Sequence, residues 1–318
     1  MKTLLLSPEI SLSKDGWQLT LSPSAGGRIT SLHCSRDGQV TDWIVPMQAY
    51  CRQQGFPATA WPKAGIYPLL PFSNRIRAGK FSWDGLEISL PLHPGEQHAM
   101  HGFGHTAEWQ LQDRDDNSAK MLYRHAPGAS GWPWAFMAKQ TIVLEVGALA
   151  MRMEITNASD EALPPMPLGV GFHPYFPRRF ARHVAFDAQQ LWQADAEHVA
   201  IGVGDIPARQ NYRNARRIAP DEEMTLYYGG WQRHADMADD HGNRIVMTAS
   251  PLLSHLVLHA PKALDYFCLE PVSHVADAVN LAQAGFADTG LQRLPCGHTF
   301  SCDMRLDFFD SGSTPEAP

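Results

Sequence analysis

The chain has 318 residues, of which 44% are hydrophobic and 19% charged, and its formal net charge is −7 at neutral pH. This length can bury a large core without disulfides or metal ions, and it corresponds to one large domain or two ordinary ones. The sequence has no dense basic tract, so we expect no nucleic-acid partner. No apolar run reaches the length of a membrane span, so we expect no membrane partner.

The cysteines indicate a reducing environment. They are odd in number, include no Cys-x-x-Cys pair, and lie at Cys34, Cys51, Cys268, Cys296 and Cys302. This pattern is typical neither of a disulfide framework nor of a zinc knot. The N-terminal apolar run Leu4–Leu6 is shorter than the roughly 7–15 residues of an export signal. We therefore expect a cytoplasmic protein.

Most segments with a clear hydrophobic period alternate apolar and polar residues, as strands with one buried face do. The first is 17–22, and a hairpin is predicted over 81–90 with its turn at Gly85. Segments 138–144 and 149–155 form a second predicted antiparallel pair, joined near Gly147. Later strand candidates are 244–248, 254–258, 266–269 and 300–306.

Helical signals are confined to 276–285, while 188–194 is compatible with a helix or a strand. The 25 glycines and 24 prolines punctuate the short apolar runs, as a turn-rich all-β chain requires. No linker or repeat divides the chain. We predict an all-β fold, with one large antiparallel domain over 1–310 and a disordered tail over 311–318.

The first candidate site residue is Arg75, which follows Asn74 in an apolar segment bounded by prolines. We expect its guanidinium to face a cavity and to donate paired hydrogen bonds to hydroxyls or a ring oxygen. The alternative is a structural arginine that binds loop carbonyls.

A second candidate site contains His98, His101 and His105. Three histidines within eight residues suggest a metal site. However, their spacing does not place all three on one face of a strand or helix, and Glu96 is the only carboxylate nearby. We favour a neutral imidazole at His101 that binds a hydroxyl, because Gly102 allows a ligand to approach the backbone.

His173 and Glu270 each lie in an apolar segment directly before a proline. Burial keeps a histidine neutral, whereas a nearby carboxylate restores its affinity for a proton. A buried carboxylate is costly unless it is paired or functional. Pro174 predicts a strand end or a rim, where side chains face a cavity, because proline cannot donate within a sheet. The pattern suits general acid–base chemistry, with a core histidine and a Glu–Arg pair as the alternatives.

In chain order, these segments resemble the aldose 1-epimerase family. The matching elements are Asn74-Arg75-Ile76, His101-Gly102, His173-Pro174-Tyr175-Phe176 and Glu270-Pro271 with Asp277-Ala278, and a softer match covers Gly27 to Leu32. The resemblance spans about residues 20–308.

The resemblance implies a galactose mutarotase-like antiparallel β-sandwich with an open, concave sugar-binding cleft. It implies an isomerase without metal or cofactor that interconverts the α and β anomers of a monosaccharide. His173 would protonate the ring oxygen, and Glu270 would accept the proton of the anomeric hydroxyl. Before the reaction His173 would therefore be protonated and Glu270 ionised. Arg75, His101, Asn74 and Tyr175 would bind the sugar, and the assembly could be a monomer or a homodimer.

The chain departs from the family pattern at one sugar-binding position. Family members usually have an aspartate a few residues before a Gly-Trp turn, and here Thr225 or Leu226 occupies that place. The sugar therefore stays open, as do two alternatives to the epimerase. One is a non-catalytic sugar-binding or sensing protein. The other is a hexose-6-phosphate 1-epimerase, which would need a cationic cluster, for which Arg77, Arg178 and Arg179 are the candidates.

Overall fold

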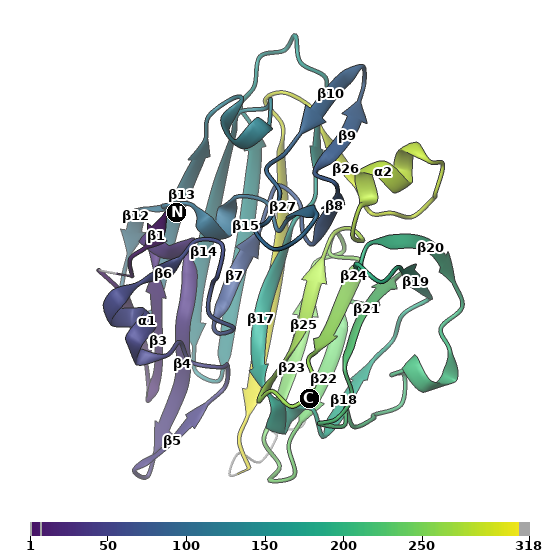
Figure 1. The fold of residues 1–318 in the computed structure, drawn as a ribbon. Coiled ribbons are helices and arrows are strands. Elements are labelled where there is room, and N and C mark those ends of the chain that lie inside the picture. Colours follow the sequence, from purple (N-terminus) through teal and green to yellow (C-terminus); the bar gives the residue numbers. More distant parts are fainter. Residues whose placement is uncertain (1, 7, 312–318) are drawn as a thin grey trace.

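The computed structural model describes residues 2–6 and 8–311, and these form two large antiparallel sheets (Figure 1). The larger sheet has the order β2 (Ile10–Lys14), β3 (Trp17–Ser22), β4 (Arg28–Arg36), β7 (Ile66–Leu69), β17 (Gly171–Pro177), β25 (Tyr266–Val272), β24 (His255–Ala260), β21 (Met224–Gly229), β19 (Gln190–Ala194) and β20 (Ala200–Gly204), with β5 (Gln39–Asp42) paired to β4. The smaller sheet has the order β12 (Gln110–Arg114), β13 (Ser118–His125), β14 (Phe136–Glu145), β15 (Ala148–Asn157), β27 (Thr299–Phe309), β23 (Arg244–Ala249), β22 (His234–Ala238) and β18 (His183–Phe186).

Short elements connect and cover the sheets. Four two-stranded pairs are β1 (Thr3–Leu4) with β6 (Phe56–Pro57), β8 (Arg75–Arg77) with β11 (His98–Met100), β9 (Lys80–Trp83) with β10 (Leu86–Ser89), and β16 (Met166–Leu168) with β26 (Gln292–Leu294). The α-helices are α1 (Ala49–Gln54) and α2 (Ala278–Gln283), and the 3₁₀ turns are η1 (Pro23–Ala25), η2 (Gly104–Thr106), η3 (Ala129–Gly131), η4 (Arg178–Phe180) and η5 (Ala208–Gln210). Among residues 2–6 and 8–311, no helix has the length and apolarity needed to cross a membrane.

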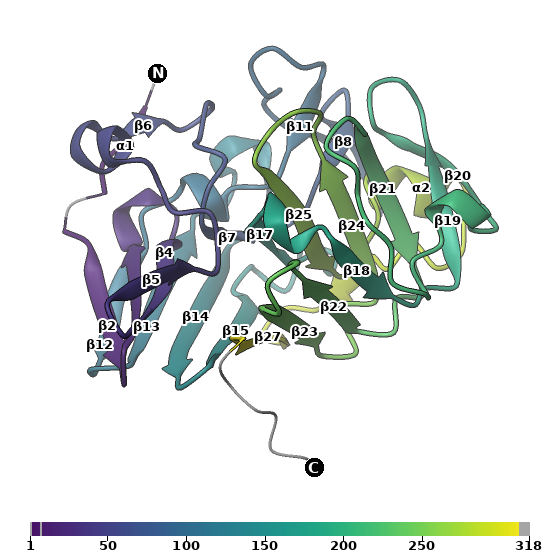
Figure 2. The ribbon, with the colours of Figure 1, turned by 90° about the horizontal axis from the view of Figure 1, so that it is seen from below.

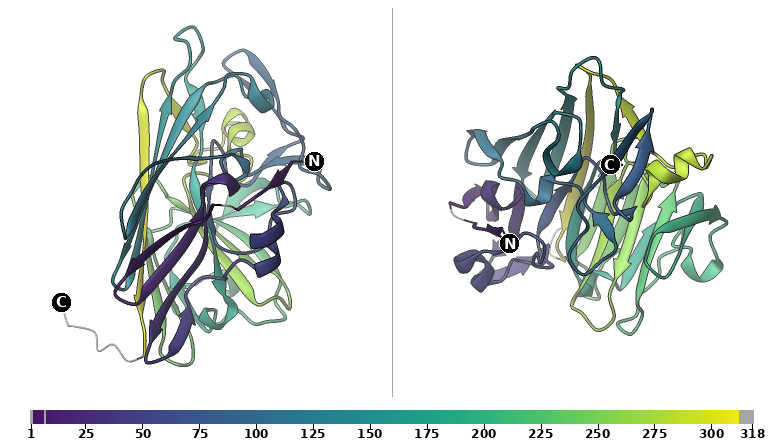
Figure 3. Two further views of the ribbon diagram at one scale, coloured as in Figure 1. Left: turned by 90° about the vertical axis from the view of Figure 1, so that its left-hand side faces the viewer. Right: turned by 45° about the horizontal axis from the view of Figure 1, so that its top comes forward.

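The two sheets lie face to face, with the main hydrophobic core between them (Figure 3, left). Aromatic stacking links the layers, because Trp17 of β3 lies 5.2 Å from Phe308 of β27 between ring centroids. Apolar and polar residues alternate along many of these strands because one side of the strand is buried in this core. Figure 2 shows short elements on the other side of the larger sheet, with α1 and β6 above β4 and β5, and β8 and β11 above β25.

Strand register positions the residues on that second side. The pairs Gly171–Val272 and Tyr175–Cys268 of β17 and β25 place His173 opposite Glu270. His173 also pairs with Tyr67 on β7, and Glu270 pairs with Val257 on β24. Because side chains alternate along each strand, these four residues share one face of the sheet.

The predicted all-β fold and its antiparallel pairs are confirmed. Segments 81–90 and 138–155 form the expected hairpins, segment 188–194 contains strand β19, and 276–285 contains helix α2. Helix α1 was not predicted. The predicted disordered tail, apart from Ser311, lies outside the described residues.

The prediction that Pro174 marks a strand end is wrong. Pro174 lies inside β17, between β7 and β25. The ladder of β17 with β25 skips from Gly171–Val272 to Tyr175–Cys268, and Pro174 and Pro271 lie in this gap. A central strand tolerates both prolines because the backbone pairing is already interrupted there.

Candidate active site

A cavity of about 190 Å³ opens on the second side of the larger sheet. Its floor carries His173 and Glu270, whose chain neighbours Phe172 and Leu269 point the other way, into the core between the sheets. The cavity is lined by Trp61, Lys63, Tyr67, Asn74, Arg75, Glu96, Met100, His101, His173, Tyr175, His198, Thr225, Val257, His259 and Glu270. All six site residues predicted from the sequence therefore line one cavity.

His173 and Glu270 form a close, buried pair. The Nε2 atom of His173 lies 3.4 Å from Oε1 of Glu270, and both side chains are almost completely buried. Neither Nδ1 of His173 nor Oε2 of Glu270 has a hydrogen-bond partner among the described residues. Buried polar groups without partners are rare in folded proteins, and they point to a site that binds a polar ligand.

Burial determines where the pair holds its proton. Burial raises the pKa of Glu270 to about 8, although Arg75 and Lys63 oppose this shift. Burial, followed by the charges of His259 and Lys63, holds the pKa of His173 well below its usual value. At neutral pH the pair therefore holds one proton, on Glu270. The number of protons matches the expectation from the sequence, but their placement is reversed, because desolvation disfavours both charged forms.

His101 presents a hydrogen-bond donor to the cavity. Its Nδ1 accepts a hydrogen bond of 3.1 Å from the backbone N–H of Asn74, so the neutral ring carries its proton on Nε2. Burial, with a further contribution from His173, holds the pKa of His101 well below its usual value. The turn is tight, because a Cβ atom on Gly102 would lie 2.1 Å from the carbonyl oxygen of Leu70.

Arg75 lines the cavity, but a carboxylate already binds most of its guanidinium. Nε and Nη2 donate hydrogen bonds of 2.8 Å to the two carboxylate oxygens of Glu96. Nη1 lies 3.4 Å from Oδ1 of Asn74, which also accepts a bond from the backbone N–H of Arg75. The paired donors expected to bind the substrate are therefore used by Glu96, which fixes the orientation of Arg75.

Two tyrosines hold the imidazole of His173. The ring of Tyr67 stacks on it with centroids 4.5 Å apart, and the ring of Tyr175 does so at 4.7 Å. The two phenol oxygens are 3.4 Å apart. Tyr175 was predicted to bind substrate, and its ring also packs against Tyr266, with ring centroids 5.2 Å apart.

Of the two residues at the place of the family's aspartate, Thr225 lines the cavity. Leu226 instead packs against the core between the sheets. Thr225 lies directly opposite His259 in the pairing of β21 with β24, and its hydroxyl shares a hydrogen bond of 2.9 Å with Nδ1 of His259. Burial and the charge of Lys63 lower the pKa of His259 to about 4. A neutral pair therefore lies where the resemblance predicts a carboxylate.

Sequence reasoning missed His259, Lys63 and Trp61. His259 alternates with Val257 along β24, so the strand pattern could have placed both on one face, but not opposite Thr225. The ammonium of Lys63 lies 5.0 Å from the ring centroid of Trp61 in a loop without a hydrophobic period. No sequence motif or period identifies these two residues.

Potential metal ligands converge at one place in the described part of the chain. One ligand atom from each of His173, Cys268 and Glu270 lies within 4.8 Å of the others. His98, His101 and His105 do not form such a group, and Nε2 of His98 lies instead 3.3 Å from a carboxylate oxygen of Glu197. Among residues 2–6 and 8–311, the only three-ligand group thus coincides with the candidate acid–base pair.

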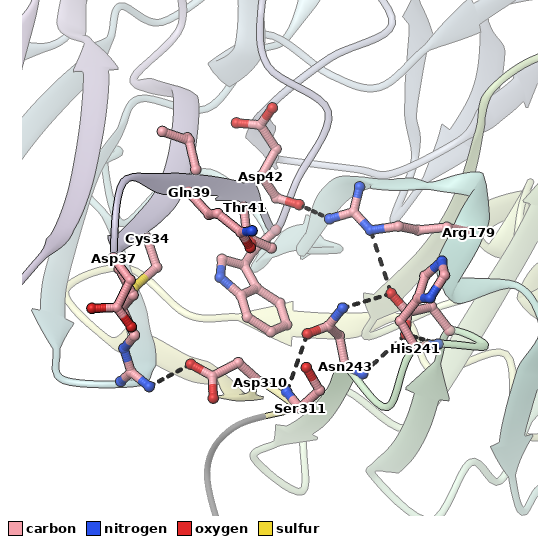
Figure 4. A pocket seen from close by; sticks show the side chains of 14 residues that line it. Cys34, Asp37, Gln39, Thr41, Asp42, Arg179, His241, Asn243, Asp310 and Ser311 are labelled. Atoms are coloured by element: carbon pink, nitrogen blue, oxygen red, sulfur yellow. Dashed lines mark hydrogen bonds and ion pairs between the residues drawn. The ribbon is translucent and has the colours of Figure 1, made fainter.

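A larger cavity of about 750 Å³ lies elsewhere, near the β4–β5 turn and Ser311 (Figure 4). Several of its polar groups bind one another: Arg36 pairs with Asp310, and Asp239 accepts a hydrogen bond of 2.8 Å from the Asn243 amide. Arg179 donates to the carbonyl oxygen of Asp42 in the same place (Figure 4). These mutual contacts stabilise turns, so we assign the candidate active site to the smaller cavity.

The three arginines considered for phosphate binding do not line the smaller cavity. Arg178 donates to three backbone carbonyls, and Arg179 binds Asp42 and lies 3.7 Å from Asp239. Arg77 donates a hydrogen bond of 2.7 Å to Asp195. This cluster therefore does not support the hexose-6-phosphate alternative.

Comparison with known proteins identifies the family of the chain. The family model for aldose 1-epimerase matches residues 9–306. The uncharacterised Escherichia coli K12 protein YphB is 28% identical over 252 residues, which cover 76% of this chain and 83% of YphB. A crystal structure from Escherichia coli K12, named provisionally as an aldose 1-epimerase, superposes with a TM-score of 0.81 at 25% identity and covers 95% of this chain and 99% of its own. A galactose 1-epimerase from Lactobacillus acidophilus has the same fold, with a TM-score of 0.72, 17% identity and coverage of 95% and 94%. The chain therefore belongs to the aldose 1-epimerase family.

Proposed function

We propose that the protein interconverts the α and β anomers of a free aldose, with His173 and Glu270 as its proton-transfer pair. The observation that supports this most directly is the distance of 3.4 Å between Nε2 of His173 and Oε1 of Glu270 at the floor of a buried cavity. In a cyclic sugar, the ring oxygen and the anomeric hydroxyl oxygen are bonded to the same carbon. An acid and a base that serve these two oxygens must therefore lie side by side, as these groups do.

The reaction conserves the proton count of the pair. Transfer of the shared proton from Glu270 to His173 gives an imidazolium beside a carboxylate. The imidazolium then protonates the ring oxygen while the carboxylate removes the anomeric hydroxyl proton, and the bond between C1 and the ring oxygen breaks. The aldehyde rotates about the C1–C2 bond, and the same steps in reverse close the ring on either face.

The remaining lining residues suit one sugar ring. The cavity of about 190 Å³ is smaller than the roughly 300–1,000 Å³ of pockets for drug-sized ligands. His101 offers Nε2–H to a hydroxyl, while Trp61 and Tyr175 provide apolar surface for C–H groups. Lys63 and Arg75 favour the ionised form of Glu270, which the reaction requires.

Exchange NMR between the two anomers tests the proposal. We expect Glu270→Gln and His173→Asn each to lower kcat by about 10²–10⁴-fold, because each removes one partner in proton transfer. Sugar binding, measured by calorimetry, should persist in both variants, since amide side chains keep similar size and polarity.

A wild-type protein that binds aldoses without accelerating exchange would instead favour the sugar-binding or sensing alternative. Near-normal turnover in Glu270→Gln would remove Glu270 from the mechanism.

A further inference from the structure

Arg28 is a completely buried cation without a hydrogen-bonding partner. It opens strand β4 and belongs to the Gly27–Leu32 segment, to which the proposed mechanism assigns no role. Its exposed fraction is 0%, and none of its three side-chain nitrogens has a partner among the described residues. Arg178 provides a contrast, because its guanidinium donates to the carbonyl oxygens of Ala219, Pro261 and Tyr266. Arg28 therefore does not join backbone segments as a structural arginine does.

Strand pairing places Arg28 next to Tyr67, whose ring stacks on the candidate acid His173. The pair Ile29–Ile66 of β4 and β7 puts Arg28 opposite Tyr67. The guanidinium carbon lies 4.3 Å from the centroid of the Tyr67 ring, whose stacking partner is His173 at 4.5 Å. A continuous stack thus runs from a cation through an aromatic ring to the imidazole beside Glu270.

The backbone before Arg28 is shaped to reach this place. Gly26 and Gly27 have φ values of +85° and +60°, which glycine adopts without strain. A Cβ atom on Gly26 would lie 2.1 Å from the carbonyl oxygen of His105, so no larger residue fits there. The two glycines therefore bring the start of β4 against the loop that also carries His101.

Burying an unpaired cation is unfavourable, and the faces of aromatic rings offset only part of that cost. Groups with such a cost cluster at functional sites. The charge of Arg28 disfavours a second positive charge on His173, together with the stronger effects of burial, His259 and Lys63. The groups that face His173 are Tyr67, Tyr175, Glu270, Cys268, His101, His105, His259 and Lys63.

We propose that Arg28 is a positioning residue for the acid–base pair. Its buried charge acts through the Tyr67 ring and keeps the imidazole of His173 neutral until the sugar binds. The same charge makes the imidazolium a stronger proton donor when it forms. This role in catalysis rests on the proposed function of His173. The effect of Arg28 on the protonation of His173 in the free protein is independent of that function.

NMR titration of the free protein, labelled with ¹³C-histidine, tests the proposal. The His173→Asn spectrum identifies the His173 signal among the 15 histidines. We expect Arg28→Met to raise the titration midpoint of His173 by about one pH unit, the size expected from one charge in a medium of intermediate dielectric constant. Arg28→Lys keeps the charge, so its midpoint should stay close to the wild-type value. The acid limb of kcat/KM should move upward in Arg28→Met by the same amount.

Arg152→Met is the matched control, because Arg152 is an exposed arginine on β15, paired with Asp303 at 3.1 Å. It should leave the His173 titration unchanged. If Arg28→Met does not fold, Arg28→Gln removes the charge while keeping a polar head. An unchanged midpoint in the neutral variants, or equal shifts in the lysine and neutral variants, would overturn the role of Arg28. A shifted midpoint in a protein without epimerase activity would contradict the proposed function alone.

Discussion

Glu270 combines a catalytic requirement with a cost in stability. Its pKa is raised to about 8 by burial, so the folded protein keeps a proton that the unfolded chain releases near pH 4.5. This contribution to stability is complete below pH 4.5 and is lost as the pH rises through 8. At pH 8 the loss is of the order of a few kcal/mol.

We therefore expect Glu270→Gln to be more stable than the wild type, by a margin that grows as the pH rises from 5 to 8. The amide cannot ionise, so it carries no such cost. Thermal unfolding of both proteins at several pH values measures the difference. A stability difference that is the same at pH 5 and pH 8 would show that burial does not raise the pKa of Glu270.

We expect Thr225 of β21 and His259 of β24, which pair across the two strands, to determine the sugar preference. Thr225 and His259 satisfy each other by a hydrogen bond of 2.9 Å, so a sugar that lacks a hydroxyl there leaves no buried group unpaired. A buried carboxylate in place of Thr225 would need a hydrogen bond from the sugar hydroxyl at this position. Sites that require a hydroxyl discriminate strongly against analogues without it.

We expect Thr225→Asp to change the kcat/KM ratio between an aldose and its deoxy analogue by about tenfold or more for one hydroxyl position. Thr225→Ser keeps the hydroxyl and should keep the wild-type ratios. Exchange NMR on glucose, galactose and their monodeoxy forms measures this. Unchanged ratios at every position in the aspartate variant would exclude this pair from substrate recognition.

The strands show which parts of the fold can be predicted from sequence. Apolar and polar residues alternate over two long runs within 138–155, and this alternation predicted the hairpin of β14 and β15. Helix α1 spans only Ala49–Gln54, which is too short for a helical period to stand out. Pro174 was misinterpreted because the preference of proline for edge strands does not foresee a gap shared with Pro271.

The site was predictable only residue by residue. His173 and Glu270 stood out as ionisable groups in apolar segments, but their opposition depends on the register of two strands far apart in sequence. Lys63 and His259 reach the cavity from segments that carry no motif. The protonation of the pair depends on burial, which a sequence pattern does not measure.

At the scale of the whole molecule, both sheets contribute to one continuous core, which includes the stacked Trp17 and Phe308. Neither sheet could bury its apolar side without the other. We therefore expect residues 1–310 to unfold as one domain, in a single cooperative transition. Tryptophan fluorescence and far-ultraviolet circular dichroism should give coincident denaturation curves. Two separated transitions would show that the chain contains two independent domains.

The alignment of His173 with Glu270 across β17 and β25 limits how this protein can diverge. Inserting or deleting one residue in either strand would turn one partner toward the core between the sheets. A shift by two residues would preserve the faces but set His173 against Cys268 or Val272. Changes in length are therefore excluded from these two strands, and new substrate ranges must arise by substitution around the cavity or in the loops above it.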